Sequence, residues 1–274
     1  MNKEKVFQSI LNGTAILITG SGAHCGALNA EGSPFPSGTE LAKEIYGFCG
    51  IDTPENPWDL QDASDTYVEM YSEKKLINIL EQILYVGAVT EAQKELYSFN
   101  WQRVYTTNYD NVPKLATNQS TNTLLPITLG MSRNEKILEE NLCIYINGYI
   151  GRLNENTLNG EFKLTGRSYL AADAIEESEW GAVFSDDIIT ADCIVIVGLS
   201  LDYDLEIKRF LYNTGVIEKT IFVEKSDISK DKIRKMERLG TVFPVGMDAF
   251  VEELLEYSKT YEGNKKDREL LQLY

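Results

Sequence analysis

The sequence predicts an α/β fold with a doubly wound parallel sheet of about six strands and a helical insertion. Three observations support this prediction. The run Ala15–Thr19 is apolar almost throughout, as expected for a parallel strand covered on both faces. Strand-like and helix-like segments alternate along the whole chain. Several apolar runs end in Gly, Ser, Asn or Asp, the residues at which parallel strands commonly turn toward a ligand.

The elements follow one another in a regular order. Helical periodicity is present over residues 3–12, 40–46, 64–71, 73–84, 178–189, 207–211, 230–239 and 248–260. The predicted strands lie at 15–19, 101–107, 142–146, 192–197, 220–223 and 241–245. Residues 51–100 therefore predict a helical insertion between the first two strands, which could cover a site.

The 274 residues suit one large domain, which we place at residues 1–262. The polar stretch 263–274 is expected to be a linker or tail, leading to a further C-terminal region. We see no internal repeat.

The charge balance argues against two classes of binding partner. With 26 Lys and Arg against 42 Asp and Glu, the net charge is −16, which disfavours direct binding of nucleic acid or an anionic membrane. No apolar run is long enough to span a bilayer and the first residues lack a signal-peptide core, so we expect a cytoplasmic location. The four cysteines form no C-x-x-C pair, and we expect no metal site.

The first predicted strand runs directly into Gly20-Ser21-Gly22, with a third glycine at Gly26. Glycine lets the backbone turn sharply and lets its N–H groups approach a phosphate. The third glycine comes one residue later than in G-x-G-x-x-G, so this motif alone is equally consistent with an ordinary strand-to-helix turn.

Polar or small residues end five of the predicted strands. They are Gly20-Ser21-Gly22, Thr107-Asn108-Tyr109-Asp110, Asn147-Gly148, Gly198-Leu199-Ser200 and Glu224. Each alone has an ordinary explanation in turn chemistry, but the carboxyl ends of parallel strands meet at one edge. The set therefore predicts a nucleotide site at that edge.

These motifs resemble the sirtuin-like domains of bacterial anti-phage defence proteins. The resemblance rests on G-S-G, W-x-x-V-Y-T-T-N-Y-D and V-G-L-S-L-D-Y-D, and it covers roughly residues 14–250. It implies a Rossmann-like domain that hydrolyses NAD+ to nicotinamide and ADP-ribose and so depletes NAD+ during infection. It also implies a homo-oligomer that works with a sensor domain or partner protein. Protein-deacetylating sirtuins carry a zinc module with two C-x-x-C pairs, so their absence favours hydrolysis over deacylation.

The resemblance also implies roles for individual residues. Gly20, Ser21 and Gly22 would hold the pyrophosphate, and Asn108 would orient the attacking water beside the nicotinamide ribose. The remaining predicted NAD+ contacts are Asp110, Gly148, Gly198, Ser200 and Glu224, the last of which would accept hydrogen bonds from the adenosine ribose.

One position departs from the family pattern, in which the third strand ends in His-Gly and the histidine is the catalytic base. This chain has Asn147-Gly148. Asparagine can form the same hydrogen bond but cannot accept a proton near neutral pH. Either the protein lacks the base by nature or an inactivating substitution stands here, and in both cases we expect NAD+ binding with poor turnover.

The only histidine, His24, lies in the glycine loop. It either contacts the ligand or packs within the loop, and it could replace the missing base. Three functions remain open at this point. They are an NAD+ glycohydrolase, a non-catalytic sensor of NAD+ or an ADP-ribose derivative that switches an attached domain, and a structural assembly module.

Overall fold

The computed structural model of the protein describes residues 1–272 except 58, 121, 135–140, 172–174 and 200–204. Its centre is a seven-stranded sheet with the order β5-β6-β4-β1-β7-β8-β9, in which every neighbouring pair is parallel. The strands are β1 (Ala15–Thr19), β4 (Arg103–Thr106), β5 (Leu125–Thr128), β6 (Leu142–Tyr145), β7 (Cys193–Val197), β8 (Thr220–Val223) and β9 (Thr241–Phe243). The predicted fold class is confirmed.

The sheet has one strand more than the six that the sequence predicts. The missed strand, β5, lies in a weakly patterned region and contains Pro126. Proline has no N–H to donate to a ladder, so it is tolerated at the edge of a sheet, where β5 lies. A strand that is partly exposed and carries proline gives little signal in the sequence.

Helices cover both faces of the sheet, and β1 shows why. Leu17 packs into a core that includes residues of α1 (Lys3–Leu11), α5 (Glu91–Ser98) and α13 (Met247–Gln272). Ile16 and Ile18 pack into a second core with α10 (Gly181–Thr190) and α11 (Leu205–Thr214). Successive side chains of a strand point to opposite faces, so a strand buried on both sides must be apolar throughout.

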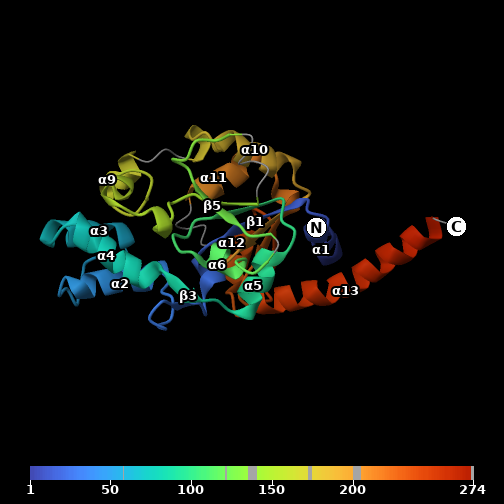
Figure 1. The fold of residues 1–274 in the computed structure, drawn as a ribbon, viewed down its shortest axis with the longest axis horizontal. Coiled ribbons are helices and arrows are strands. Elements are labelled where there is room, and N and C mark those ends of the chain that lie inside the picture. Colours follow the sequence, from blue (N-terminus) through green and yellow to red (C-terminus); the bar gives the residue numbers. More distant parts are fainter. Residues whose placement is uncertain (58, 121, 135–140, 172–174, 200–204, 273–274) are drawn as a thin grey trace.

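The insertion forms a separate helical group beside the sheet, which Figure 1 shows in blue and cyan. It comprises α2 (Gly38–Phe48), α3 (Leu60–Met70) and α4 (Glu73–Leu84), followed by β3 (Val86–Ala88). The short β3 pairs antiparallel with β2 (Leu28–Asn29), so the region predicted as helical also contains a strand. The group begins at α2, before the predicted boundary at residue 51.

The remaining elements are short helices and the C-terminal helix. They are η1 (Ser21–His24), α6 (Val112–Ala116), η2 (Ile150–Arg152), α8 (Glu155–Leu158), α9 (Gly166–Ala171), η3 (Ile175–Glu177), η4 (Ile217–Lys219) and α12 (Lys230–Met236). Helix α13 continues through the predicted domain boundary at residue 262, and its last turns project away from the sheet (Figure 1). Among the described residues, no helix is long and apolar enough to cross a membrane.

Candidate functional site

The carboxyl ends of the central strands lie side by side, because the register aligns their last residues. Thr19 of β1 lies opposite Thr106 of β4 and Val197 of β7, and Thr106 lies opposite Tyr145 of β6. The loops that follow these strands carry the predicted site residues apart from Glu224, which follows β8 (Thr220–Val223). The chain continues from β1 to one side of the sheet and from β7 to the other, so the topological switch point lies between β1 and β7. This is where doubly wound sheets bind ligands.

Glycine is required at this switch point because two backbones touch there. Gly198 has φ +64°, and a side chain on it would fall on the backbone of Gly22 and Ala23. A Cβ on Gly20 would lie 2.7 Å from the carbonyl oxygen of Gly198. The loop after β1 therefore packs directly on the end of β7, and glycine is the residue that permits this approach.

The same contact uses some of the amides that we predict to bind phosphate. The Gly20 N–H donates to the Val197 oxygen at 3.0 Å, and the Gly22 N–H donates to the Gly198 oxygen at 2.9 Å. Ser21 lies between them and is exposed. A phosphate at this turn would thus meet Ser21 first and would share or displace the hydrogen bonds of the two glycines.

Asn108 and Asp110 lie in the loop after β4, and both contact His24 of the loop after β1. The His24 ring nitrogen Nδ1 is 2.6 Å from Asp110 Oδ2 and 2.8 Å from Asn108 Nδ2. The other ring nitrogen, Nε2, is 2.6 Å from the hydroxyl of Tyr97. His24 and Asp110 are completely buried, and Asn108 is almost so. A direct contact between His24 and a ligand would require the imidazole to leave this network.

Tyr97 belongs to the network but does not stand out in the sequence. It lies on α5, over which the sequence predicts no separate helix, and its hydroxyl also donates to Thr19 Oγ1 at 3.1 Å. Gln93, on the same helix, is fully buried and donates to the carbonyl oxygens of Ala23 and Cys25. A buried glutamine facing a glycine loop is visible only once the fold is known.

Asn147 follows β6, the strand next to β4, and lies beside the Asn108 loop. The side-chain Nδ2 of Asn147 donates to the Thr107 carbonyl oxygen at 2.9 Å. The backbone carbonyl oxygen of Asn147 accepts from the Lys163 N–H at 2.9 Å. Gly148 has φ +102°, and a Cβ there would lie 2.8 Å from Phe162. The two residues predicted to be catalytic, Asn108 and Asn147, thus lie on adjacent loops at one edge.

Glu224 ends β8, two strands away from β1, and is mostly buried. Its Oε2 is 3.4 Å from the ammonium of Lys232, and the structure gives it no contact with the network around His24. Ser200 lies outside the described residues. The predicted contacts of Glu224 with ribose, and all other predicted ligand contacts, stay predictions.

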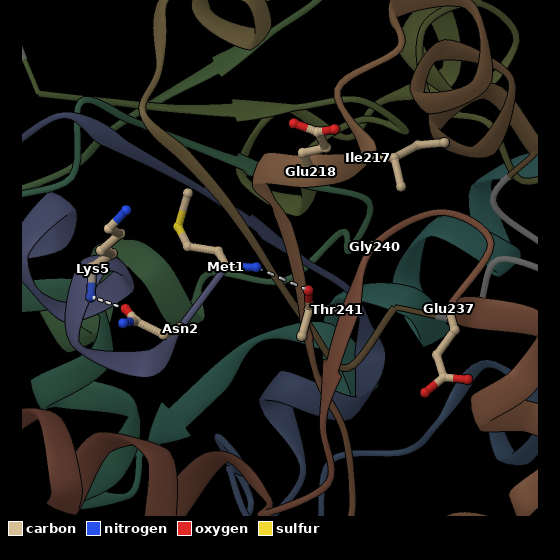
Figure 2. A pocket seen from close by; sticks show the side chains of 8 residues that line it. All are labelled: Met1, Asn2, Lys5, Ile217, Glu218, Glu237, Gly240 and Thr241. Carbon is tan, nitrogen blue, oxygen red and sulfur yellow. Dashed lines mark hydrogen bonds between the residues drawn. The ribbon is translucent and has the colours of Figure 1, made fainter.

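One hollow among the described residues lies at the opposite edge of the sheet. It has a volume of about 560 Å³ and is lined by Met1, Asn2, Lys5, Ile217, Glu218, Glu237, Gly240 and Thr241 (Figure 2). The α-amino group of Met1 lies 3.3 Å from Thr241 Oγ1 there. This hollow opens at the amino ends of β8 and β9, so it is separate from the cluster of predicted site residues.

The described residues contain no group of three or more His, Cys, Asp or Glu side chains that could hold a metal ion. Cys49, Cys143 and Cys193 are buried and unpaired, as expected for small apolar side chains, and Cys25 is exposed.

No family model and no curated protein matches this chain. A solved structure from work on the structural basis for the mechanism and regulation of Sir2 enzymes is similar to it, with a TM-score of 0.46 and 12% identity. The match covers 95% of this chain and 98% of that chain. The sheet order and register define the class, a doubly wound parallel α/β protein with a polar cluster at the strand ends.

Proposed function

We propose that this chain binds NAD+ at the carboxyl ends of β1, β4, β6 and β7 and hydrolyses the bond between nicotinamide and ribose. The observation that carries the proposal is that Asn108 and Asn147 lie on adjacent loops, where Asn147 donates to the Thr107 carbonyl oxygen and Asn108 contacts His24 of the loop after β1. The sequence resemblance assigns catalytic roles to these two positions, and the fold brings them to one edge.

To cleave the nicotinamide–ribose bond, the protein mainly has to position the ribose and the attacking water. Loss of nicotinamide leaves an oxocarbenium-like ribose, which water then attacks. Asn108 can hold a water or a ribose hydroxyl through its amide, and Asn147 can accept a hydrogen bond from a ribose hydroxyl. Neither can take the proton that the attacking water loses, because an amide is not basic near neutral pH. A general base contributes about a hundred- to ten-thousand-fold in rate, so slow turnover is the expected result.

The test follows nicotinamide release from NAD+ by the chain and by its Asn147→His variant. We expect the variant to be faster by about a hundred-fold or more, because the imidazole can accept the proton. Asn141→His is the matched control, since Asn141 precedes the same strand at its opposite end and is exposed. If none of the three proteins releases nicotinamide and none binds NAD+, the proposal is overturned.

One observation favours a second function. The Asn147 amide donates to the Thr107 carbonyl, so in this chain the position is part of a loop-to-loop contact rather than a base. A chain that binds NAD+ or an ADP-ribose derivative without turnover would act as a sensor that switches an attached domain. If the unmodified chain and Asn147→His both bind NAD+ but Asn147→His does not hydrolyse it, this second function is supported.

The cellular role belongs to the same proposal. By resemblance, the chain would deplete cytoplasmic NAD+ in anti-phage defence, working as a homo-oligomer with a sensor region. Light scattering of the chain with and without NAD+ measures the assembly, and the NAD+ content of infected cells measures the depletion.

A further inference from the structure

The network around His24 contains a conflict that fixes where its proton lies. Nδ1 of His24 has two close neighbours, Asp110 Oδ2 at 2.6 Å and Asn108 Nδ2 at 2.8 Å. A ring nitrogen either carries a proton and donates or is bare and accepts. It cannot donate to the carboxylate and accept from the amide at the same time.

The charge of Asp110 decides the conflict. An ionised carboxylate at 2.6 Å needs a donor, and a bare Nδ1 would place two lone pairs against each other. The second oxygen of Asp110 accepts the Val112 N–H at 2.8 Å, so it is already satisfied. In every arrangement that keeps the buried Asp110 ionised, Nδ1 of His24 is protonated, because an unpaired buried charge is costly.

The other ionisable groups facing this pair cannot supply the charge instead. Burial raises the pKa of Tyr97, Cys143 and Tyr145 well above their ordinary values, and the nearby Asp110 carboxylate raises each further. All three groups are therefore neutral near pH 7, so none of them supplies a second charge beside His24 and Asp110.

The position of this proton sets the orientation of Asn108. An amide nitrogen beside a protonated Nδ1 brings two donors face to face. A half-turn of the amide about its Cβ–Cγ bond puts Oδ1 there instead, where it can share the Nδ1 proton with Asp110. Among the described residues, nothing is hydrogen-bonded to the opposite end of the amide, so this end is available to a ligand.

We propose that His24, anchored by Asp110, is a positioning residue that turns the Asn108 amide so that its oxygen faces the imidazole and its Nδ2 donors face the ligand. The inference rests on the proposed NAD+ site for the identity of that ligand. His24 acts through Asn108 and does not touch NAD+.

Two substitutions of similar size separate this role from simple packing. In His24→Asn, the amide nitrogen is bonded to Cγ, as Nδ1 is, so it keeps a donor toward Asp110 and Asn108. In His24→Gln, the amide lies one bond further out, so it keeps a partner for Tyr97 and loses the donor at the Nδ1 position. A packing role would be served about equally by both.

The assay uses both variants in the Asn147→His background and measures kcat and KM for NAD+. We expect His24→Asn to retain kcat within about threefold and His24→Gln to lose about tenfold or more, the effect of about one hydrogen bond, with little change in KM. Equal losses in the two variants would overturn the inference.

A second measurement, ¹⁵N NMR of the unmodified protein, requires neither NAD+ hydrolysis nor a variant that folds. His24 is the only histidine in the chain, so its two ring nitrogens give the only imidazole signals in a ¹⁵N NMR spectrum. We expect a protonated Nδ1 in the unmodified protein at neutral pH, with ADP-ribose absent or present. A bare Nδ1 would refute the inference, whereas failure of NAD+ binding with a protonated Nδ1 would count against the proposed function alone.

Discussion

Two buried carboxylates lie at opposite ends of β4 and differ in the partner that neutralises them. Near the amino end, Asp187 of α10 is 2.6 Å from Arg103 Nε and accepts from the Tyr105 hydroxyl at 2.6 Å. Beyond the carboxyl end, Asp110 is 2.6 Å from Nδ1 of His24. Every guanidinium nitrogen of arginine is a donor, whereas a histidine ring nitrogen donates only when it carries a proton. Burial is similar at both ends, so the chemistry of the partner distinguishes them: Arg103 can only donate to Asp187, whereas the bond to Asp110 depends on which ring nitrogen of His24 carries a proton.

The same contrast applies to the hollows. The hollow at the amino edge is lined by described groups that are dispersed and mostly exposed. The carboxyl edge has its polar groups buried and bonded to one another. The presence of a hollow therefore does not by itself identify the edge at which doubly wound sheets bind ligands.

The largest effect on stability is expected at Asp187, the carboxylate paired with Arg103. Asp187→Ala removes the partner of Arg103 and leaves a mostly buried guanidinium unpaired. Breaking a buried pair in this way should lower the free energy of unfolding by about 3–5 kcal/mol, measured by denaturant titration. Asp186→Ala, at the exposed neighbouring position, should change it by less than about 0.5 kcal/mol. If the two substitutions lower the free energy of unfolding equally, the Arg103–Asp187 pair does not stabilise the fold.

The second prediction tests the tight approach at the carboxyl edge. Gly198 and Gly215 share φ +64°, but a Cβ on Gly198 would meet the backbone of Gly22 and Ala23, and one on Gly215 would meet nothing within 4 Å. Gly215→Ala should cost about 1–2 kcal/mol from the left-handed backbone alone. Gly198→Ala should cost about 2–4 kcal/mol, because overpacking adds to it. A similar cost at both positions would show that the two loops can separate freely.

The third prediction concerns the glycine loop itself. Gln93→Leu leaves the carbonyl oxygens of Ala23 and Cys25 without their side-chain donor and should lower stability by about 1–3 kcal/mol. Gln8→Leu is the control, since Gln8 is only half-buried and its amide donates to the hydroxyl of Tyr257 at 2.9 Å. Thermal unfolding of both variants would compare them, and a larger loss for Gln8→Leu would contradict the role of Gln93.

The sequence predicts the framework of this fold well because its signals are local. The run at β1 is apolar on both faces, and every predicted strand is present. Strand β5 escapes prediction because a short edge strand with proline has neither periodicity nor burial to mark it. The list of strand-end residues identifies which loops meet, but not how their side chains are paired.

The pairing of His24 shows why the site is harder to predict than the sheet. The sequence places His24 in the glycine loop and Asp110 after the second predicted strand, but their contact spans 86 positions in the chain. Tyr97, on α5, completes the network from a third segment of the chain. Such contacts depend on the relative placement of three separate segments, which periodicity and turn chemistry do not encode.

The smallest effect is expected at Glu224, where the partner is a flexible, half-exposed cation. Lys232 approaches Glu224 at 3.4 Å with 44% of its side chain exposed, so Lys232→Met should lower stability by less than about 1 kcal/mol. Binding of NAD+, measured by calorimetry, should not weaken, because the Glu224 carboxylate is then free to accept from a ribose hydroxyl. Lys230→Met, at the exposed start of α12, serves as the control for the lost charge. A tenfold loss of affinity in Lys232→Met alone would assign the ammonium, rather than the carboxylate, to the ligand.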